Sequence, residues 1–176
     1  MDLTERIEGL KAAIRDVPDF PKKGIVFKDI TTLLRDPVAF RKAMDLFALL
    51  CSETGANKVV AVESRGFILG GVLAERLGAG FVPVRKLGKL PAATLKVTYD
   101  LEYGSDSLEI HADALAKGDR ALLVDDVIAT GGTARAAGEL VERLGASVAA
   151  HAFLVELTFL KGRSALEGPI YSLIRY

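Results

Sequence analysis

Apolar residues in the first third of the chain recur at helical spacing. One short N-terminal helix is predicted by four positions that share a face: Leu3, Ile7, Leu10 and Ile14. A second helix is predicted to begin near Asp36-Pro37, where a first turn tolerates proline, by a similar face: Phe40, Met44, Phe47 and Cys51. Residues 16–29, between these helices, carry two prolines and no helical period, so we expect a loop there.

The rest of the chain alternates short apolar runs with helical faces. Two strand–helix–strand units are predicted: residues 59–62, 66–77 and 81–84 form the first, and residues 121–124, 134–144 and 148–155 form the second. Gly78 and Gly145 follow the two helices, where helices commonly end. Pro83 has no N–H to donate, which predicts that its strand lies at an edge or near a bulge. This alternation indicates an α/β fold with a parallel-core twisted sheet flanked by helices.

The stretch from residue 87 to residue 104 is less regular. It contains Pro91, lysines and two tyrosines, and it predicts an exposed loop followed by one or two extended segments, the second at residues 107–111. The chain has no internal repeat, low-complexity tract or linker. Residues 1–176 are therefore expected to form a single domain.

The composition narrows the class of protein. Lys+Arg and Asp+Glu both total 23, and this balance disfavours a nucleic-acid partner, which usually requires a basic excess. Cys51 is the only cysteine, so no intrachain disulfide can form. Charged residues begin the chain where a signal peptide would be apolar, and no apolar run reaches the roughly 18 residues of a membrane span. We expect a cytoplasmic protein with no membrane partner.

The strongest chemical signal follows the apolar run at residues 121–124. Asp125 and Asp126 come first, and a short loop of small and hydroxyl residues leads into a helix: Ala129, Thr130, Gly131, Gly132 and Thr133. Ligands of open α/β sheets bind beyond the carboxyl ends of the strands. Glycines and a helix N-terminus suit a phosphate, whereas carboxylates suit sugar hydroxyls, so the pattern predicts a sugar-phosphate site.

Two alternatives bear on this element. A double glycine alone is more often a plain strand–helix connection, but the full order of residues here is much rarer. An ATPase would need a glycine-rich loop ending in Gly-Lys-Ser or Gly-Lys-Thr, which the chain lacks. Neighbouring strand residues point to opposite faces, so both acids can reach one sugar only if the strand ends or bends at Asp125.

The element resembles the phosphoribosyl-pyrophosphate signature of the type I phosphoribosyltransferases. The resemblance implies that Asp125 and Asp126 hold the ribose hydroxyls. It also implies that the loop of residues 129–133 holds the 5′-phosphate. Beyond this element, the resemblance runs to the end of the chain, through residues 154–157 and 160–163.

Two basic segments gain a role from this resemblance. Ser64 and Arg65 follow the first core strand, and by themselves they fit a capping serine beside a surface arginine equally well. The resemblance implies a pyrophosphate loop there, with a cis peptide bond to be sought between Ser64 and Arg65. Three further cations alone would indicate a solvated loop, but the resemblance makes them pyrophosphate ligands: Arg85, Lys86 and Lys89.

The resemblance also implies a mobile lid at residues 86–106, part of which acts on the neighbouring subunit. Ala92 departs from the glycine expected after Lys-Leu-Pro, which affects the hinge of that lid. Glu102 matches the family's general acid/base position, and Tyr103 belongs to the same lid. From the residues alone, Glu102 would be an exposed strand glutamate.

The segment at residues 18–30 resembles the adenine-specific members of the family. Phe27 offers a face for purine stacking, and backbone groups of Val26 and Lys28 are expected to read the base edge. Lys28 replaces an expected arginine, a change that matters little if the backbone does the reading. The same segment also fits a loop anchored by Phe20 and Phe27, and both interpretations hold together. Residues 1–35 are thus expected to form a small N-terminal hood over the base.

The resemblance therefore implies a purine salvage enzyme that makes AMP and pyrophosphate from adenine and 5-phosphoribosyl-1-pyrophosphate. It further implies a homodimer and a Mg²⁺ ion held by substrate oxygens and water rather than by protein ligands. One rival is the same reaction on a 6-oxo purine, and another is a sensor that binds the sugar phosphate without chemistry. His111 and His151 lie in no metal-binding pattern and are taken as structural.

Overall fold

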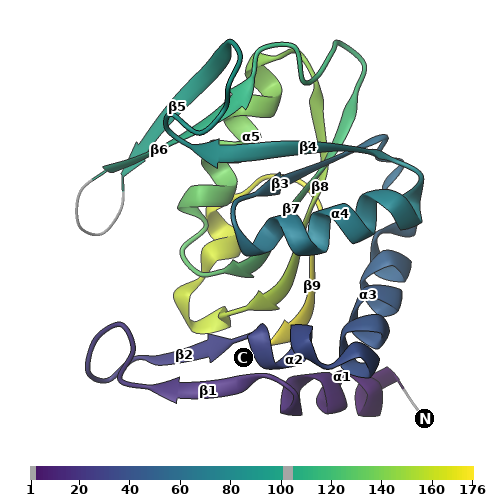
Figure 1. Cartoon of the computed structure of the whole chain (residues 1–176), viewed down its shortest axis with the longest axis vertical. Helices are drawn as coiled ribbons and strands as arrows, with labels where there is room; N and C mark the ends of the chain where they lie inside the picture. The colour runs from purple at the N-terminus through teal and green to yellow at the C-terminus, as the bar shows by residue number, and fades with distance from the viewer. Residues whose placement is uncertain (1–2, 101–104) are drawn as a thin grey trace.

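The computed structural model describes residues 3–100 and 105–176. It contains a seven-stranded sheet in the order β5-β6-β4-β3-β7-β8-β9 and a separate two-stranded sheet of β1 and β2 (Figure 1). The strands are β1 (Arg15–Pro18), β2 (Val26–Asp29), β3 (Lys58–Val62), β4 (Gly80–Lys86), β5 (Thr94–Asp100), β6 (Ser105–His111), β7 (Arg120–Ile128), β8 (Ser147–Glu156) and β9 (Ile170–Arg175). The helices are α1 (Leu3–Ala12), α2 (Thr31–Arg35), α3 (Pro37–Cys51), α4 (Arg65–Leu77) and α5 (Gly132–Arg143), with short 3₁₀ turns η1 (Ser52–Thr54), η2 (Thr158–Leu160) and η3 (Gly162–Ala165).

The core of the large sheet is parallel, as the sequence predicted. β4, β3, β7, β8 and β9 pair in parallel, whereas β6 pairs antiparallel with both β4 and β5. Alternate residues of the central strands face the two sides of the sheet. Val59 of β3 and Leu122 of β7 pack with α3 and α4, whereas Val60 and Leu123 pack with α5 on the other side. Both faces of the sheet are therefore covered, as an α/β fold requires.

The ends of the main helices also follow the prediction. Asp36 caps α3 by accepting hydrogen bonds from Val38 N at 2.8 Å and Ala39 N at 3.1 Å. α4 ends at Gly78, which has φ +63°. No helix among residues 3–100 and 105–176 is long and apolar enough to cross a membrane.

The N-terminal segment differs from the prediction. Residues 16–29 were expected to be a loop, but β1 and β2 form an antiparallel hairpin in which Arg15 pairs with Asp29. Each strand has only four residues, Pro18 ends β1 and Pro21 follows it, so no alternation could be found from the local pattern. The sequence also gave no indication of α2 or β9.

β7 is longer than predicted. The strand was expected to end or bend at Asp125, but it continues to Ile128 because β8 still pairs with it there. Pairing with β3 on its other side stops at Val124, so the edge beyond this residue opens toward the site. Pro83 lies in β4, whose pairing with β6 is confined to Arg85 and Lys86, so the proline meets a locally free edge.

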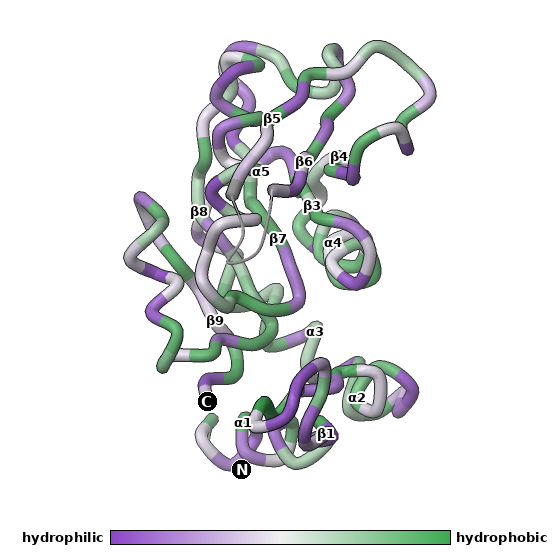
Figure 2. Tube along the Cα trace, turned by 90° about the vertical axis from the view of Figure 1, so that its left-hand side faces the viewer, coloured by the Kyte–Doolittle hydropathy of each residue, from purple (hydrophilic) through white to green (hydrophobic). Residues whose placement is uncertain are grey.

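The N-terminal elements lie at one end of the molecule, below the large sheet in Figure 1 and again in the perpendicular view of Figure 2. Contacts join this unit to the end of the chain: Lys28 Nζ lies 4.1 Å from the Tyr176 ring centroid, and the Tyr176 hydroxyl donates to Lys11 O at 3.4 Å. The carboxyl ends of β7, β8 and β9 thus face the N-terminal hairpin. This arrangement leaves a cleft between the two parts of the molecule.

Candidate active site

Segments far apart in sequence meet at the carboxyl edge of the sheet. A cavity of about 360 Å³ there is bordered by the residue after β3, the start of α4, the end of β4 and the acids of β7. Its polar lining includes six of the residues predicted for the ribose phosphate and the pyrophosphate: Ser64, Arg65, Lys86, Asp125, Asp126 and Thr133. Glu63, which was not predicted, also lines it, whereas the predicted Arg85 and Lys89 do not. The parallel order of β4, β3 and β7 thus brings part of the predicted site into one place.

The loop after β7 forms a smaller hollow of about 80 Å³, lined by residues 127–134 with Asp125 and Phe153. Gly131 has φ +85°, a conformation that a residue with a Cβ adopts at a cost. A Cβ at Gly131 would lie 2.5 Å from the carbonyl oxygen of Gly162, so the two loops meet backbone to backbone. No side chain caps the N-terminus of α5, which leaves its first amides directed toward the hollow for an anion.

The two acids of β7 have different surroundings. Asp126 is buried, with 6% of its surface exposed, and its carboxylate accepts a hydrogen bond from Arg65 Nε. Asp125 accepts a hydrogen bond from the backbone N of Asp126 at 2.8 Å. Burial and the neighbouring Asp126 charge raise the pKa of Asp125 well above its ordinary value. A carboxyl group with a raised pKa can hydrogen-bond a sugar hydroxyl either as acceptor or, when protonated, as donor.

Each of the four predicted pyrophosphate cations faces a carboxylate. Arg65 pairs with Asp126, and Lys86 pairs with Asp106 at 3.0 Å. Glu63 forms ion pairs with the other two, with Arg85 at 2.8 Å and with Lys89 at 3.1 Å. The hydrogen bond and charge of Asp106 raise the pKa of Lys86, which keeps this amine cationic.

The turn between β3 and α4 contains the expected non-proline cis peptide, but at another bond. It joins Glu63 to Ser64, one residue before the Ser64-Arg65 bond where it was sought. Ser64 makes no side-chain capping bond to α4, so the alternative of a plain capping serine is not supported. Arg65 instead points its guanidinium at Asp126 and lies 5.6 Å from the Phe27 ring centroid.

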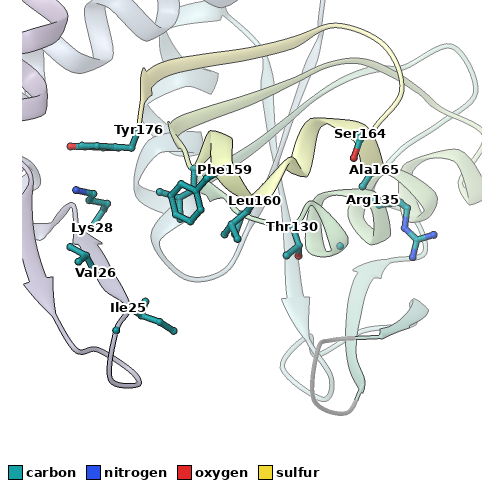
Figure 3. A pocket seen from close by; sticks show the side chains of 14 residues that line it. Ile25, Val26, Lys28, Thr130, Arg135, Phe159, Leu160, Ser164, Ala165 and Tyr176 are labelled. Atoms are coloured by element: carbon teal, nitrogen blue, oxygen red, sulfur yellow. The ribbon is translucent and has the colours of Figure 1, made fainter.

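A second, larger cavity of about 1340 Å³ separates the N-terminal hairpin from the core (Figure 3). Val26 and Lys28 line it from one side, opposite Phe159, Leu160 and Thr130. The loop that carries Thr130 thus borders both this cavity and the phosphate hollow. The cavity has the place expected for a base beside a bound sugar phosphate.

Phe27 and Lys28 are placed differently from one another. The Phe27 ring is not among the side chains that line the large cavity; it packs edge-on against Phe20, with ring centroids 5.3 Å apart. The Lys28 amine is engaged elsewhere, since it pairs with Asp16 at 2.6 Å and lies over the Tyr176 ring. The Lys28 side chain thus borders the cavity with its amine already paired to protein groups.

Sequence reasoning missed part of the lining. Leu157, Phe159 and Leu160 border the large cavity, and their position directly after β8 at the same sheet edge was a usable signal. Tyr99 and Asp106 border the 360 Å³ cavity, and the Tyr99 hydroxyl lies 3.3 Å from Thr133 Oγ1. Nothing in the local pattern indicated these two, because only the antiparallel pairing of β5 and β6 brings them to the site. Glu102 and Tyr103, the predicted acid/base and lid residues, lie outside the described residues.

The fold and the elements at this edge define a type I phosphoribosyltransferase, and the phosphoribosyl transferase domain family matches residues 29–172. The chain is 56% identical to the adenine phosphoribosyltransferase of Geobacter metallireducens over 171 residues, which cover 97% of this chain and all of that protein. The crystal structure of adenine phosphoribosyltransferase from Thermoanaerobacter pseudethanolicus superposes with a TM-score of 0.94 at 54% identity, covering 97% of this chain and 99% of that one. The enzyme from Saccharomyces cerevisiae, crystallised with adenine and an imino-altritol bisphosphate, gives 0.93 at 47% identity, covering 97% and 99%. The chain belongs to the adenine phosphoribosyltransferase family, which confirms the predicted family and fold class.

Proposed function

We propose that this protein is a purine salvage transferase that makes AMP and pyrophosphate from adenine and 5-phosphoribosyl-1-pyrophosphate. The observation that carries this function is the adjacency of three cavities. The hollow of the anion loop and the 360 Å³ cavity with its carboxylates and cations share Asp125 and Thr133, and the large cavity lies between the same loop and the N-terminal hairpin. A sugar phosphate in the first two cavities would present its anomeric carbon to a flat base in the large one.

The proposed roles at the sugar follow from the chemistry of each group. The loop at residues 129–133 binds the 5′-phosphate through the first amides of α5 and the hydroxyls of Thr130 and Thr133. Although β7 continues through them, Asp125 and Asp126 both line the 360 Å³ cavity, and they are proposed to accept hydrogen bonds from the ribose hydroxyls there. Binding of these hydroxyls would share the Asp126 carboxylate with Arg65, which then turns part of its guanidinium to the pyrophosphate.

The pyrophosphate would lie in the 360 Å³ cavity, at the end opposite the loop of residues 129–133. Its proposed ligands are Ser64, Arg65, Arg85, Lys86 and Lys89. Negative charge grows on the pyrophosphate as its bond to the sugar breaks, and cations already fixed beside it stabilise that charge without rearranging. The cations would thus contribute more in the transition state than in the bound substrate.

The base is proposed to be selected by backbone groups of Val26 and Lys28. The exocyclic amine of adenine is a donor and is matched by a carbonyl, whereas a 6-oxo purine would leave that carbonyl without a partner. The engagement of the Lys28 amine by Asp16 and Tyr176 supports reading by the backbone instead of by this side chain. Phe27 completes the proposed base site if its ring moves from Phe20 onto the purine.

Proton transfer and closure are assigned to the segment around the β5–β6 hairpin. Glu102 is proposed as the general acid/base that takes the proton lost by adenine, and Tyr103 as a lid residue beside it. Residues 86–106 are proposed to form a mobile lid. The contact between Tyr99 and Thr133 supports this role, since it joins the hairpin directly to the phosphate loop.

A Mg²⁺ ion is proposed to accompany the pyrophosphate, and the residues of the cavity fit that ion. Asp125 and Asp126 supply carboxylate oxygens, the ligand type that Mg²⁺ prefers, at the ribose side of the cavity. Among residues 3–100 and 105–176, no three His, Cys, Asp or Glu side chains gather to hold a metal by themselves. The ion would therefore sit mainly on substrate oxygens and water, where it neutralises the leaving group.

A homodimer and a cytoplasmic location complete the proposal. Large apolar side chains are exposed on α3, α4 and β4: Leu49, Leu50, Ile68 and Phe81. A second copy of the chain is proposed to cover such side chains, since exposed apolar surface commonly marks an interface. Sedimentation of the purified protein tests the dimer directly.

The function is tested by incubating the protein with radiolabelled adenine, 5-phosphoribosyl-1-pyrophosphate and Mg²⁺, with guanine and hypoxanthine in parallel. AMP from adenine alone is the expected result. Turnover of 6-oxo purines only would overturn the assignment of base selection to Val26 and Lys28. Binding of the sugar pyrophosphate without turnover of any base would make the protein a sensor instead of an enzyme.

A further inference from the structure

Glu63 is a buried carboxylate at the end of β3, and it joins this strand to the turn that follows β4. Only 7% of its side chain is exposed. One carboxylate oxygen accepts from Arg85 Nε at 2.8 Å, and the other accepts from Lys89 Nζ at 3.1 Å and from the backbone N of Lys86 at 3.2 Å. A single acid thus binds three groups of the turn at residues 85–89, which we call the basic turn.

Arg85 closes this arrangement into a ring. Its Nε donates to Glu63, and its Nη1 donates to the carbonyl oxygen of Lys89 at 3.0 Å. The Arg85 side chain is therefore fixed at two points, and the turn is drawn back onto the end of β4. Two cations share one negative charge, so the cluster keeps a net positive charge for an anion.

A second buried acid holds the same turn in a different way. Glu109 of β6, with 8% of its surface exposed, accepts from the backbone N of Gly88 at 2.9 Å and from the Thr94 hydroxyl at 3.2 Å. Among residues 3–100 and 105–176, no cation donates a hydrogen bond to Glu109 or forms an ion pair with it. Both Glu63 and Glu109 therefore bind backbone groups of the turn, but Glu63 is the one that also pairs with the cations Arg85 and Lys89.

We propose that Glu63 is a positioning residue of the pyrophosphate subsite, which holds Arg85 and Lys89 in the geometry that receives the leaving group. This inference rests on the proposed function. Long cationic side chains lose rotamer freedom when they bind an anion, and a side chain that is already fixed loses less. Glu63 thus favours binding of the pyrophosphate end of the substrate while it remains outside the reacting atoms.

The ionisation of Glu63 fits this role. Burial by itself would raise the pKa of Glu63, but the hydrogen bonds from Arg85 and Lys89 outweigh burial and lower it below the ordinary value. The carboxylate is therefore charged throughout the neutral range. The opposite role, in which Glu63 competes with pyrophosphate for the cations, predicts the opposite sign for every effect below.

The decisive variant is Glu63→Gln, which keeps the shape of the side chain but removes its charge. We expect the KM for 5-phosphoribosyl-1-pyrophosphate and the inhibition constant of pyrophosphate to rise by about tenfold or more. The KM for adenine should stay within about twofold, because the base cavity does not include Glu63. A merely structural role would change all three constants together or lower only stability.

Glu109→Gln is the matched control. It removes the charge of a buried acid of β6 that binds the same turn, and its amide oxygen can still accept from Gly88. All three constants should stay within about twofold of wild type. A tenfold effect in Glu109→Gln equal to that in Glu63→Gln would overturn the proposal, since any charge removal near the turn would then suffice.

Glu63→Asp keeps the test decisive if the glutamine variant does not fold. Aspartate retains the charge on a shorter side chain, and its effect should have the same selectivity for the pyrophosphate constants with a smaller size. Loss of affinity for adenine alone, or a lower KM for the sugar pyrophosphate in either variant, would overturn the role of Glu63. Absence of turnover in the wild-type protein would instead overturn the proposed function, so the two failures are distinguishable.

Discussion

The two ends of the proposed sugar-phosphate site bind their anions with different kinds of group, backbone amides at one end and charged side chains at the other. At the loop of residues 129–133, the anion is met by backbone amides, and the shape of the loop depends on Gly131 and its close approach to Gly162. At the pyrophosphate end, the anion is met by long side chains that are fixed by acids such as Glu63 and Asp106. One end is thus determined by backbone conformation and the other by charge pairing.

The two ends therefore tolerate different kinds of substitution. A backbone site has no side chain to exchange and is sensitive to volume and to φ, but it is insensitive to the exact charge of its neighbours. A side-chain site tolerates small shifts of the backbone but depends on the shape and charge of each group.

The largest effect is expected from Gly131→Ala. The substitution combines a positive φ, which costs roughly 1–2 kcal/mol, with a Cβ only 2.5 Å from the Gly162 oxygen. The loop must shift, so kcat/KM for 5-phosphoribosyl-1-pyrophosphate should fall by about 100-fold or more. Steady-state kinetics and thermal melting measure the two consequences.

Gly145→Ala is the control for Gly131→Ala. Gly145 has nearly the same φ, +84°, but a Cβ there meets nothing within 4 Å. This variant should lose about 1 kcal/mol of stability and keep its activity. If Gly131→Ala behaved like Gly145→Ala, the loop geometry would not be what recognises the phosphate.

Arg65→Lys tests the side-chain end and should have the next largest effect. Lysine keeps the positive charge but loses the planar fork that joins Asp126. We expect kcat/KM for the sugar pyrophosphate to fall by about 10- to 100-fold. Arg76→Lys, in the last turn of the same helix and paired with exposed Asp45, should leave activity unchanged. Full activity of Arg65→Lys would mean that charge alone is sufficient.

Asp125→Asn should raise stability while it lowers activity. The pKa of Asp125 is raised in the folded protein, so the folded state binds more protons than the unfolded state at intermediate pH. The free energy of unfolding of the wild type therefore falls as pH rises from about 4 through the raised pKa. Asparagine removes this loss, and the melting temperature at pH 8 should increase by about 2–4 °C, the shift that 1 kcal/mol produces in a chain of this size.

The gain from Asp125→Asn should shrink as pH falls toward the ordinary aspartate pKa. Asp126→Asn, the neighbouring control, should bring no gain because it leaves Arg65 without its partner. A pH-independent difference between wild type and Asp125→Asn would contradict the titration of Asp125 as its cause. Unfolding followed by circular dichroism across this pH range makes the comparison.

Lys28→Arg should have the smallest effect. The proposed base site reads the base with backbone groups, as the phosphate loop reads its anion, and arginine can still reach Asp16 and the Tyr176 ring. The KM for adenine should change by less than about twofold. A larger change would show that the side chain at position 28 takes part in base selection, so that the base is not selected by backbone groups alone.

The sequence predicted the parts of the molecule that depend on local pattern. Buried strands such as β3 and helices such as α4 show their periodicity directly, and the Asp125-to-Thr133 element carries its own chemistry. The hairpin of β1 and β2 was missed because its short strands are stabilised by each other and not by any local preference. The pairing of Glu63 with Arg85 was also beyond local pattern, since the two residues are 22 positions apart and meet only through the sheet.

The pairing of the four predicted pyrophosphate cations with acids has a consequence for how the substrate arrives. Arg65, Lys86 and the two partners of Glu63 face three carboxylates, so all but one of their positive charges are compensated before any ligand is present. Seen from a distance, the entrance then carries little excess field, so diffusional steering of a polyanion should be weak. We expect an association rate that changes little with ionic strength, and residence time in the site, not capture from solution, should set the affinity for the substrate.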